Sequence, residues 1–235
     1  MCSSDLTVQG AGLGTTVITG AGAAVGDEML LFVDAAPGEG PLVLRDLTLE
    51  QGGGRFPETG VLLSHALDME RCALEGGLAG LVYEPWEDLA SDDLRIVDCT
   101  FSNQSEVAVE ALLAPHASLP ADVVITGNTV LGGAIAVELV ELFPTTIANG
   151  TVTISNNTLT GGASIHCGHA WLNDSPLARS GDWTFADNDL GTNSLEGLGF
   201  GYEAHAGAGD VDLLVAMTGN VSNGVFVGGG IECGG

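Results

Sequence analysis

The chain contains no lysine, and its five arginines stand against 31 acidic residues, which gives a formal net charge of −26 over 235 residues. Nucleic-acid binding depends on Lys and Arg side chains that neutralise phosphates, so this composition excludes nucleic acid as a partner. An anionic membrane surface would repel the chain for the same reason. The acidic excess has three interpretations: a surface adapted to high salt, carboxylate sites for divalent cations, or an ordinary solvated face.

Long apolar runs and export signals are also missing. No stretch approaches the roughly 18 to 20 apolar residues that span a bilayer, so no transmembrane segment is expected. The start, Met1-Cys2-Ser3-Ser4-Asp5, lacks the basic and apolar regions of a signal peptide. Five cysteines are an odd number, which excludes a disulfide framework that pairs every cysteine within the chain. Hydrophobic residues still make up 45%, too many for a disordered acidic chain.

A repeat organises the sequence. Seven segments share the pattern apolar, any residue, apolar, two variable residues, a turn residue, any residue, apolar. The turn residues, spaced by 25 to 32 residues, are Leu47, Cys72, Cys99, Asn128, Asn157, Asn188 and Asn220. Apolar and polar residues alternate within each segment, which is typical of a strand with one buried face. Each repeat also holds a second apolar run and no helical periodicity, so we expect two or three strands per repeat that stack as a solenoid.

Three positions in every repeat, apolar in all copies except at Ser222, are expected to face one interior. They are occupied by Leu42, Leu44 and Leu49 in the first repeat and by Val215, Met217 and Ser222 in the last. The residues between them are mostly polar, as an outward face requires.

This repeat, with glycines after it, resembles the right-handed parallel β-helix of the pectin-lyase-like superfamily over about residues 6–233. The resemblance implies an all-β, right-handed parallel β-helix solenoid of about seven to eight coils with no major helix. It implies a single domain over residues 1–235, with coils near 6–20, 42–53, 67–77, 94–104, 123–133, 152–162, 183–193 and 215–227. Neither end carries an evident cap, so we expect both ends to be truncated and the uncapped coils to be open to end-to-end association.

In that family the turn asparagines stack into an internal ladder. Asn128, Asn157, Asn188 and Asn220 match this position, and Cys72 and Cys99 replace asparagine in earlier coils. Because asparagine tolerates a left-handed backbone, we expect the ladder residues themselves to adopt it.

The cysteines and histidines leave alternatives open. Cys72 and Cys99 are expected to stack within about 5 Å, as reduced thiols, a disulfide or a metal pair. The segment His166-Cys167-Gly168-His169 has a metal-like composition. Strand alternation sends His166 and Cys167 to opposite faces, which favours a buried Cys167 beside surface histidines over a zinc or copper site.

One connection per repeat lengthens along the chain, and insertions in a solenoid map to one face, often the binding face. Each of these connections carries an aromatic residue or a histidine near carboxylates. Such residues suit stacking on sugar rings and hydrogen bonding to sugar hydroxyls. Alternatively, the aromatic residues only anchor the long loops. The candidate ligand-binding residues are Tyr83, Trp86, His116, Phe143, His169, Trp171, Tyr202 and His205. The candidate calcium ligands are Glu84, Glu87, Asp88, Asp92 and Asp93.

Two functions follow from these patterns. The first is a secreted or cell-surface module that binds a glycan or serves in adhesion, without catalysis and without a required cofactor. The second, which the resemblance also implies, is a polysaccharide lyase or glycoside hydrolase. Asp187 and Asp189 form the tightest carboxylate pair for hydrolysis. Carboxylates that converge beside an arginine would favour the enzyme, and carboxylates spread evenly would favour the binding module.

Overall fold

The computed structural model describes residues 6–20, 29–33, 41–51, 59–63, 66–83, 93–113, 121–141, 149–171, 179–191, 198–204, 211–221 and 231–233. These ranges contain strands, turns and bends but no helix, so the expected all-β fold is confirmed for them. It follows that no helix in these ranges has the length and apolar character needed to cross a membrane.

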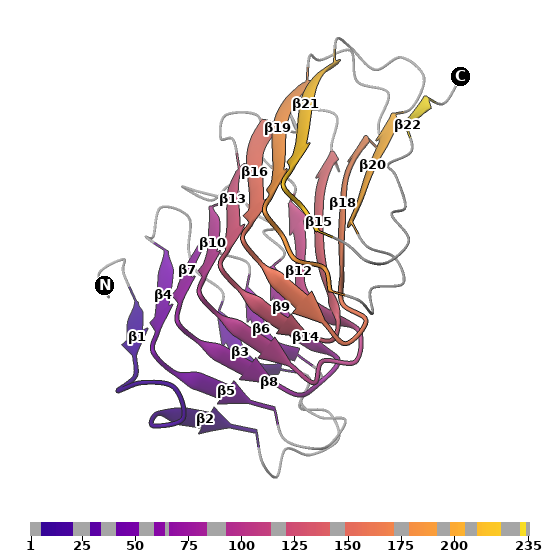
Figure 1. The fold of residues 1–235 in the computed structure, drawn as a ribbon. Helices are drawn as coiled ribbons and strands as arrows, with labels where there is room; N and C mark the ends of the chain where they lie inside the picture. The colour runs from indigo at the N-terminus through magenta and orange to yellow at the C-terminus, as the bar shows by residue number, and fades with distance from the viewer. Residues whose placement is uncertain are drawn as a thin grey trace, which may run out of the picture.

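The strands form three parallel sheets, and successive strands of the chain visit the sheets in turn (Figure 1). Sheet A consists of β1 (Thr7–Gln9), β4 (Leu42–Arg45), β7 (Leu67–Glu70), β10 (Leu94–Val97), β13 (Ala121–Thr126), β16 (Asn149–Ser155), β19 (Arg179–Ala186) and β21 (Val211–Thr218). Sheet B consists of β2 (Val17–Thr19), β5 (Thr48–Glu50), β8 (Ala73–Glu75), β11 (Thr100–Ser102), β14 (Thr129–Leu131) and β17 (Thr158–Thr160). Sheet C consists of β3 (Met29–Val33), β6 (Thr59–Leu63), β9 (Ala79–Tyr83), β12 (Val107–Leu113), β15 (Ala134–Glu141), β18 (Ser164–Trp171), β20 (Leu198–Ala204) and β22 (Ile231–Cys233). This arrangement is a parallel β-solenoid.

The solenoid has fewer closed turns than the seven or eight coils expected. About 4 consecutive turns, β7–β9, β10–β12, β13–β15 and β16–β18, have a strand in each sheet and described buried side chains on all three walls. Beyond β17 the described part of sheet B continues only as the isolated bridges Thr158↔Asp189 and Asp189↔Val221. The reason is local: Gly191 takes a φ of 63° where earlier turns place the third residue of a strand, so extended pairing stops.

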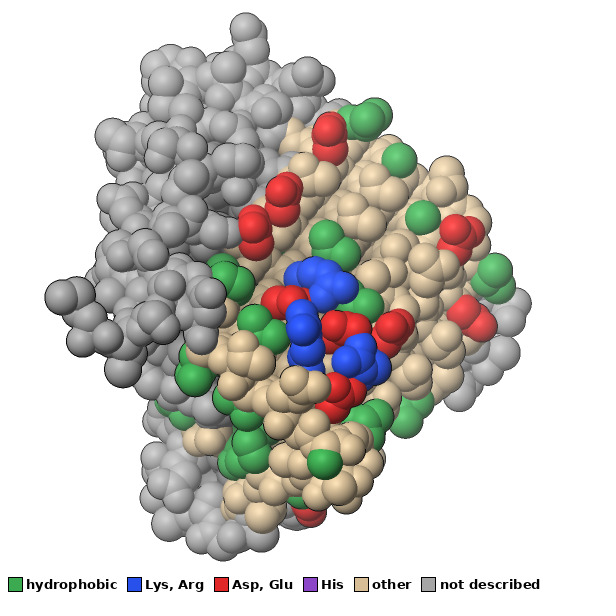
Figure 2. Space-filling view, turned by 90° about the vertical axis from the view of Figure 1, so that its left-hand side faces the viewer, with side chains coloured by type: hydrophobic (Ala, Val, Ile, Leu, Met, Phe, Trp, Pro, Cys, Tyr) green, Lys and Arg blue, Asp and Glu red, His purple; other side chains and the backbone are tan. Residues whose placement is uncertain are grey.

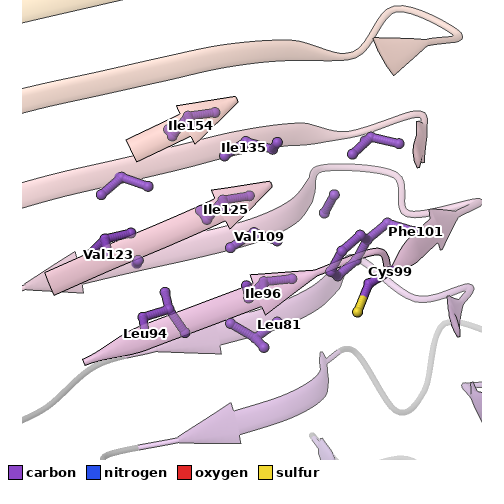
Figure 3. Close-up of a cluster of buried hydrophobic side chains, with 14 of the residues drawn as sticks. Leu81, Leu94, Ile96, Cys99, Phe101, Val109, Val123, Ile125, Ile135 and Ile154 are labelled. Atoms are coloured by element: carbon purple, nitrogen blue, oxygen red, sulfur yellow. The ribbon is translucent and has the colours of Figure 1, made fainter. Parts of the chain in front are cut away.

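The inward positions predicted by the repeat are confirmed in its first six copies, where every one is at most 2% exposed. Figure 3 shows how they stack: Leu94 and Ile96 of β10 lie below Val123 and Ile125 of β13, and Phe101 closes the corner. The last copy departs from the pattern, because Val215 is 36% exposed. Each buried Leu, Ile or Val contributes about 1.5–3 kcal/mol, so the stacked turns hold most of the fold's apolar stabilisation.

The asparagine stack at the corner between sheets A and B is confirmed. Asn157 donates from Nδ2 to the Ile125 carbonyl at 2.9 Å and to Asn188 Oδ1 at 2.9 Å. Its own Oδ1 accepts from the backbone N–H of Asn128 at 2.9 Å and from Asn128 Nδ2 at 3.0 Å. The same pattern joins Asn188 to Asn220, with Nδ2 to Oδ1 at 2.8 Å. Each buried amide therefore satisfies backbone groups of the neighbouring turns.

The left-handed backbone does not fall on the ladder residues, so that expectation was wrong by one position. The positive φ belongs to the residue before each ladder position, for example 55° at Asn156 and 70° at Gly127. The residues with positive φ at this corner are Asp46, Arg71, Asp98, Gly127, Asn156, Asp187 and Gly219. The side chains of the non-glycine residues among them point outward. The left-handed backbone reverses the chain direction at the corner, and the next residue, at the ladder position, points inward.

Candidate functional site

Six charged side chains gather on the outer face of sheet A, over β4, β7 and β10 (Figure 2). They are Arg45, Asp46, Asp68, Glu70, Arg71 and Arg95, here called the charged network. The network holds three of the chain's five basic residues and is balanced by three carboxylates. It is the convergent arrangement of carboxylates beside arginines that would favour an enzyme.

Strand register builds the charged network. Arg45 pairs with Glu70, and Asp68 pairs with Arg95, as direct Cα partners on neighbouring strands. The Arg45 guanidinium lies 2.9 Å from Asp68 Oδ2 and 3.4 Å from Glu70 Oε2. Arg71 leaves the corner turn and reaches Asp46 of the preceding turn, with Nε to Oδ1 at 2.7 Å. Further ion pairs join Arg71 to Glu70 and Arg95 to Asp68.

Within this network, pairing between Arg71 and Asp46 shifts the pKa of both groups. The hydrogen bond from Arg71 lowers the pKa of the Asp46 carboxyl. The same hydrogen bond raises the pKa of the Arg71 guanidinium. A catalytic base must release and accept a proton near neutral pH, and these shifts move both groups away from that range. The Asp46–Arg71 pair is therefore held in its ionised form as a surface salt bridge.

The Asp46–Arg71 pair makes stability depend on acidity. The pKa of Asp46 is lower in the folded chain than in the unfolded chain, so the pair's contribution is complete above the unfolded pKa. It is lost as the pH falls through the folded pKa. We expect Asp46→Asn to lower Tm at pH 7 and to leave Tm unchanged at the acidic end of a thermal-unfolding series. The exposed Asp122→Asn on β13 is the matched control, and an equal Tm loss in both variants would contradict the pairing.

The two ladder cysteines are free thiols in the structure and form no disulfide with each other. The backbone N–H of Cys72 donates to Cys99 Sγ at 3.4 Å, and Cys99 Sγ donates to the Val97 carbonyl at 3.2 Å. The hydrogen bond with the Cys72 side chain, together with burial, raises the pKa of the Cys99 thiol. Both sulfurs thus extend the hydrogen-bonded stack into the earlier turns.

Three of the predicted ligand-binding residues are brought together in sheet C. His169 of β18 and Tyr202 of β20 are direct Cα partners, and Trp171, two residues along β18, pairs with Glu141 of β15. They lie in strands and not in loops as expected. Strands of sheet C lengthen from five residues in β9 to eight in β18, so parallel pairing absorbs residues expected in the connections.

Tyr83 does not belong with this group. Its side chain is 0% exposed and packs in the hydrophobic core at the end of β9, because this position continues the inward alternation of Ala79 and Leu81. The remaining predicted ligand-binding residues, Trp86, His116, Phe143 and His205, lie outside the described residues.

The candidate calcium ligands Glu84, Glu87, Asp88 and Asp92 also lie outside the described residues. Asp93 is described and exposed, immediately before β10. Within the described ranges no three His, Cys, Asp or Glu side chains are grouped so that they could hold a metal ion. Cys167 of the metal-like segment is buried in the core, as strand alternation predicted.

Asp187 and Asp189 have structural roles at the corner. Both are exposed, on either side of the buried Asn188. Asp189 Oδ1 accepts a hydrogen bond from the Gly191 N–H at 3.0 Å, which closes an Asx turn. A β-carbon at Gly219 would clash with Asp187 Oδ1, so the Asp187 carboxylate packs against the backbone of the next turn.

Sequence reasoning missed two buried amides at the far end of sheet B. Gln51 Nε2 donates to the Ala79 carbonyl at 3.0 Å, and Gln104 Nε2 donates to the Leu74 carbonyl at 3.1 Å. Both residues follow a strand of sheet B, where other repeats have glycine. A polar residue in place of a repeated glycine is the signal that could have revealed them.

Comparison with known proteins adds no relative: no family model, no curated protein and no solved structure matches this chain. Its function must therefore be argued from its own residues.

Proposed function

We propose that this chain is an extracellular or cell-surface β-helix module that binds a polysaccharide or cell-surface glycan without cleaving the glycan backbone. The observation that supports this proposal is the placement of His169 beside Tyr202, with Trp171 two residues further along β18. These three residues occupy adjacent strands about 4.8 Å apart.

The chemistry around these positions suits a carbohydrate. Aromatic rings present apolar faces that stack on the C–H faces of sugar rings, and imidazole and carboxylate groups bond to hydroxyls. Glu141 of β15 is the direct partner of Trp171 and supplies a carboxylate at that register position. The net charge of −26 opposes polyanions, so the glycan in this proposal is neutral.

The experiment is titration of neutral and acidic glycans against the wild-type chain and the variants Trp171→Ala and Tyr202→Ala. Each variant should bind its glycan about tenfold or more weakly, a loss of about 1.4 kcal/mol. Tm is measured for each variant beside binding, because alternation from Ile165 and Cys167 places these positions on the inward side of sheet C. Leu214→Ala, at an exposed position of β21, should bind as the wild type does. A collapse of Tm in both aromatic variants would show that these residues hold the sheet together instead. Release of oligosaccharides, detected by mass spectrometry, would show that the chain is an enzyme.

The enzymatic alternative draws on the charged network, which does bring carboxylates and arginines together. Its carboxylates are occupied by guanidinium groups, and the raised pKa of Arg71 opposes its use as a base. A polysaccharide lyase or glycoside hydrolase is therefore the second candidate, behind glycan binding.

The finer fold assignment is also a proposal. We assign the solenoid a right-handed coil of the pectin-lyase-like kind, because crossovers between parallel strands of one sheet are right-handed in nearly all proteins. The asparagine stack supports the same assignment.

A further inference from the structure

A serine and a histidine on β18 form a hydrogen-bonded pair that glycan binding does not use. Ser164 Oγ lies 2.9 Å from His166 Nε2. Ile165 and Cys167 on the same strand point into the core, so alternation places Ser164 and His166 together on the outer face of sheet C. When the imidazole is neutral with its proton on Nδ1, Nε2 accepts the Ser164 hydroxyl proton.

The two members of the pair differ in burial. The Ser164 side chain is buried, at 6% exposure, while His166 is partly exposed. Limited contact with water strengthens the hydrogen bond between them, because fewer water molecules compete for either atom. The partly exposed imidazole can exchange its proton with solvent. A nucleophile held by hydrogen bond to a neighbouring base is the arrangement that activates serine.

The neighbours of this pair are small. Ala134 is the direct partner of Ser164, and Ala136 and Gly199 are the partners of His166 on the two sides. None carries more than a methyl group, so no long side chain at these register positions stands between the pair and an approaching group.

We propose that Ser164 is a nucleophile and His166 its general base, and that they cleave an uncharged carboxylic ester such as an O-acyl group on a glycan hydroxyl. Ser164 Oγ forms a bond to the acyl carbon as its proton passes to His166 Nε2. The carbon–oxygen bond to the alcohol breaks, and the alcohol oxygen takes that proton. Water then attacks the acyl-serine, again giving its proton to Nε2, and releases the carboxylic acid and Ser164 with its proton restored.

The choice of an ester follows from the chemistry of the pair. An alkoxide is a better leaving group than the anion of an amine, so an ester depends less on proton transfer from Nε2 than an amide does. The strong negative charge of the chain opposes phosphate and sulfate esters, whose groups are anionic. The inference does not require the proposed glycan-binding residues, since Ser164 and His166 lie on positions of β18 that alternate with His169 and Trp171.

The test is covalent labelling of the full chain with an uncharged fluorophosphonate, followed by peptide mass spectrometry. One phosphonyl group should appear on Ser164, and Ser164→Ala should not be labelled there. His166→Ala should react about a hundredfold or more slowly, the usual contribution of a general base.

Ser155→Ala is the matched control, since this hydroxyl on β16 bonds to Thr126 Oγ1 at 3.0 Å and has no imidazole in that bond. In this variant the fluorophosphonate should label Ser164 at the wild-type rate. The circular dichroism spectrum of every variant should match that of the wild type. The rate of p-nitrophenyl acetate hydrolysis should be lost in Ser164→Ala, reduced in His166→Ala and unchanged in Ser155→Ala. Absence of label on Ser164 in the folded wild type, or an equal rate in His166→Ala, would overturn the proposal.

Discussion

Replacing Asn157 with Ala should lower the free energy of unfolding by about 3–5 kcal/mol, because several buried polar groups lose their partners at once. Asn157 Nδ2 donates hydrogen bonds to the Ile125 carbonyl and to Asn188 Oδ1. Asn157 Oδ1 accepts hydrogen bonds from the backbone N–H and from Nδ2 of Asn128. All of these atoms belong to buried asparagines or to backbone next to the core, so water cannot replace the missing amide. Each unsatisfied group costs about 1–3 kcal/mol, partly relieved by local relaxation.

Urea unfolding followed by circular dichroism measures this loss. The neighbouring residue supplies a control: Asn156 is exposed and has a φ of 55°, so Asn156→Gly should change stability by no more than about 1 kcal/mol. A loss below about 1 kcal/mol for Asn157→Ala would show that the stack contributes little and that the apolar layers alone hold the turns.

Trp183→Ala should cost a similar amount, about 3–5 kcal/mol, for a different reason. Trp183 on β19 is 0% exposed, and its ring stacks on Phe185 with centroids 6.3 Å apart. It lies in register with Val152 of β16, at the point where sheet B gives way to isolated bridges. Truncation to alanine would leave a cavity among the core residues of this turn, which include Phe185, Leu190 and Leu198.

The same unfolding experiment tests this prediction, with Leu214→Ala as the control. Leu214 is 62% exposed on the adjacent strand, so its truncation should cost less than about 0.5 kcal/mol. Trp183→Phe should recover part of the loss, since it restores a ring in the core. Equal stability of Trp183→Ala and the wild type would mean that this end of the solenoid does not unfold together with the earlier turns.

The core could be predicted from sequence because two independent regularities agree on it. Leu94, Ile96 and Phe101 alternate with polar residues, and the same pattern returns at intervals close to one turn of the solenoid. An apolar residue that fits both the two-residue period of a strand and the period of the solenoid turn is predicted to face the core. The inward asparagines follow from the same logic, since Asn128 and Asn157 recur at the same place in the pattern.

The remaining features depend on relations that sequence spacing does not express. The left-handed residue is Asn156 and not Asn157, although both are asparagine and only their position in the corner separates them. The strand that contains His169 continues because β15 and β20 on its two sides are also long. The bond from Arg71 to Asp46 spans 25 residues of sequence but only one step between turns.

The asparagine stack also aligns a row of side-chain amide dipoles along the axis of the solenoid. The side-chain amides of Asn128, Asn157 and Asn188 each accept a hydrogen bond at oxygen from the earlier turn and donate from nitrogen to the asparagine oxygen of the later turn. Their dipoles therefore add along the axis, and each polarises the next. The column favours hydrogen-bond donors at its early end, where the Cys99 N–H donates to Asn128 Oδ1. At the late end, Asn220 accepts from Asn188 and donates to the Phe185 carbonyl of the preceding turn. A turn added at either end must keep this orientation, since a reversed amide would set oxygen against oxygen.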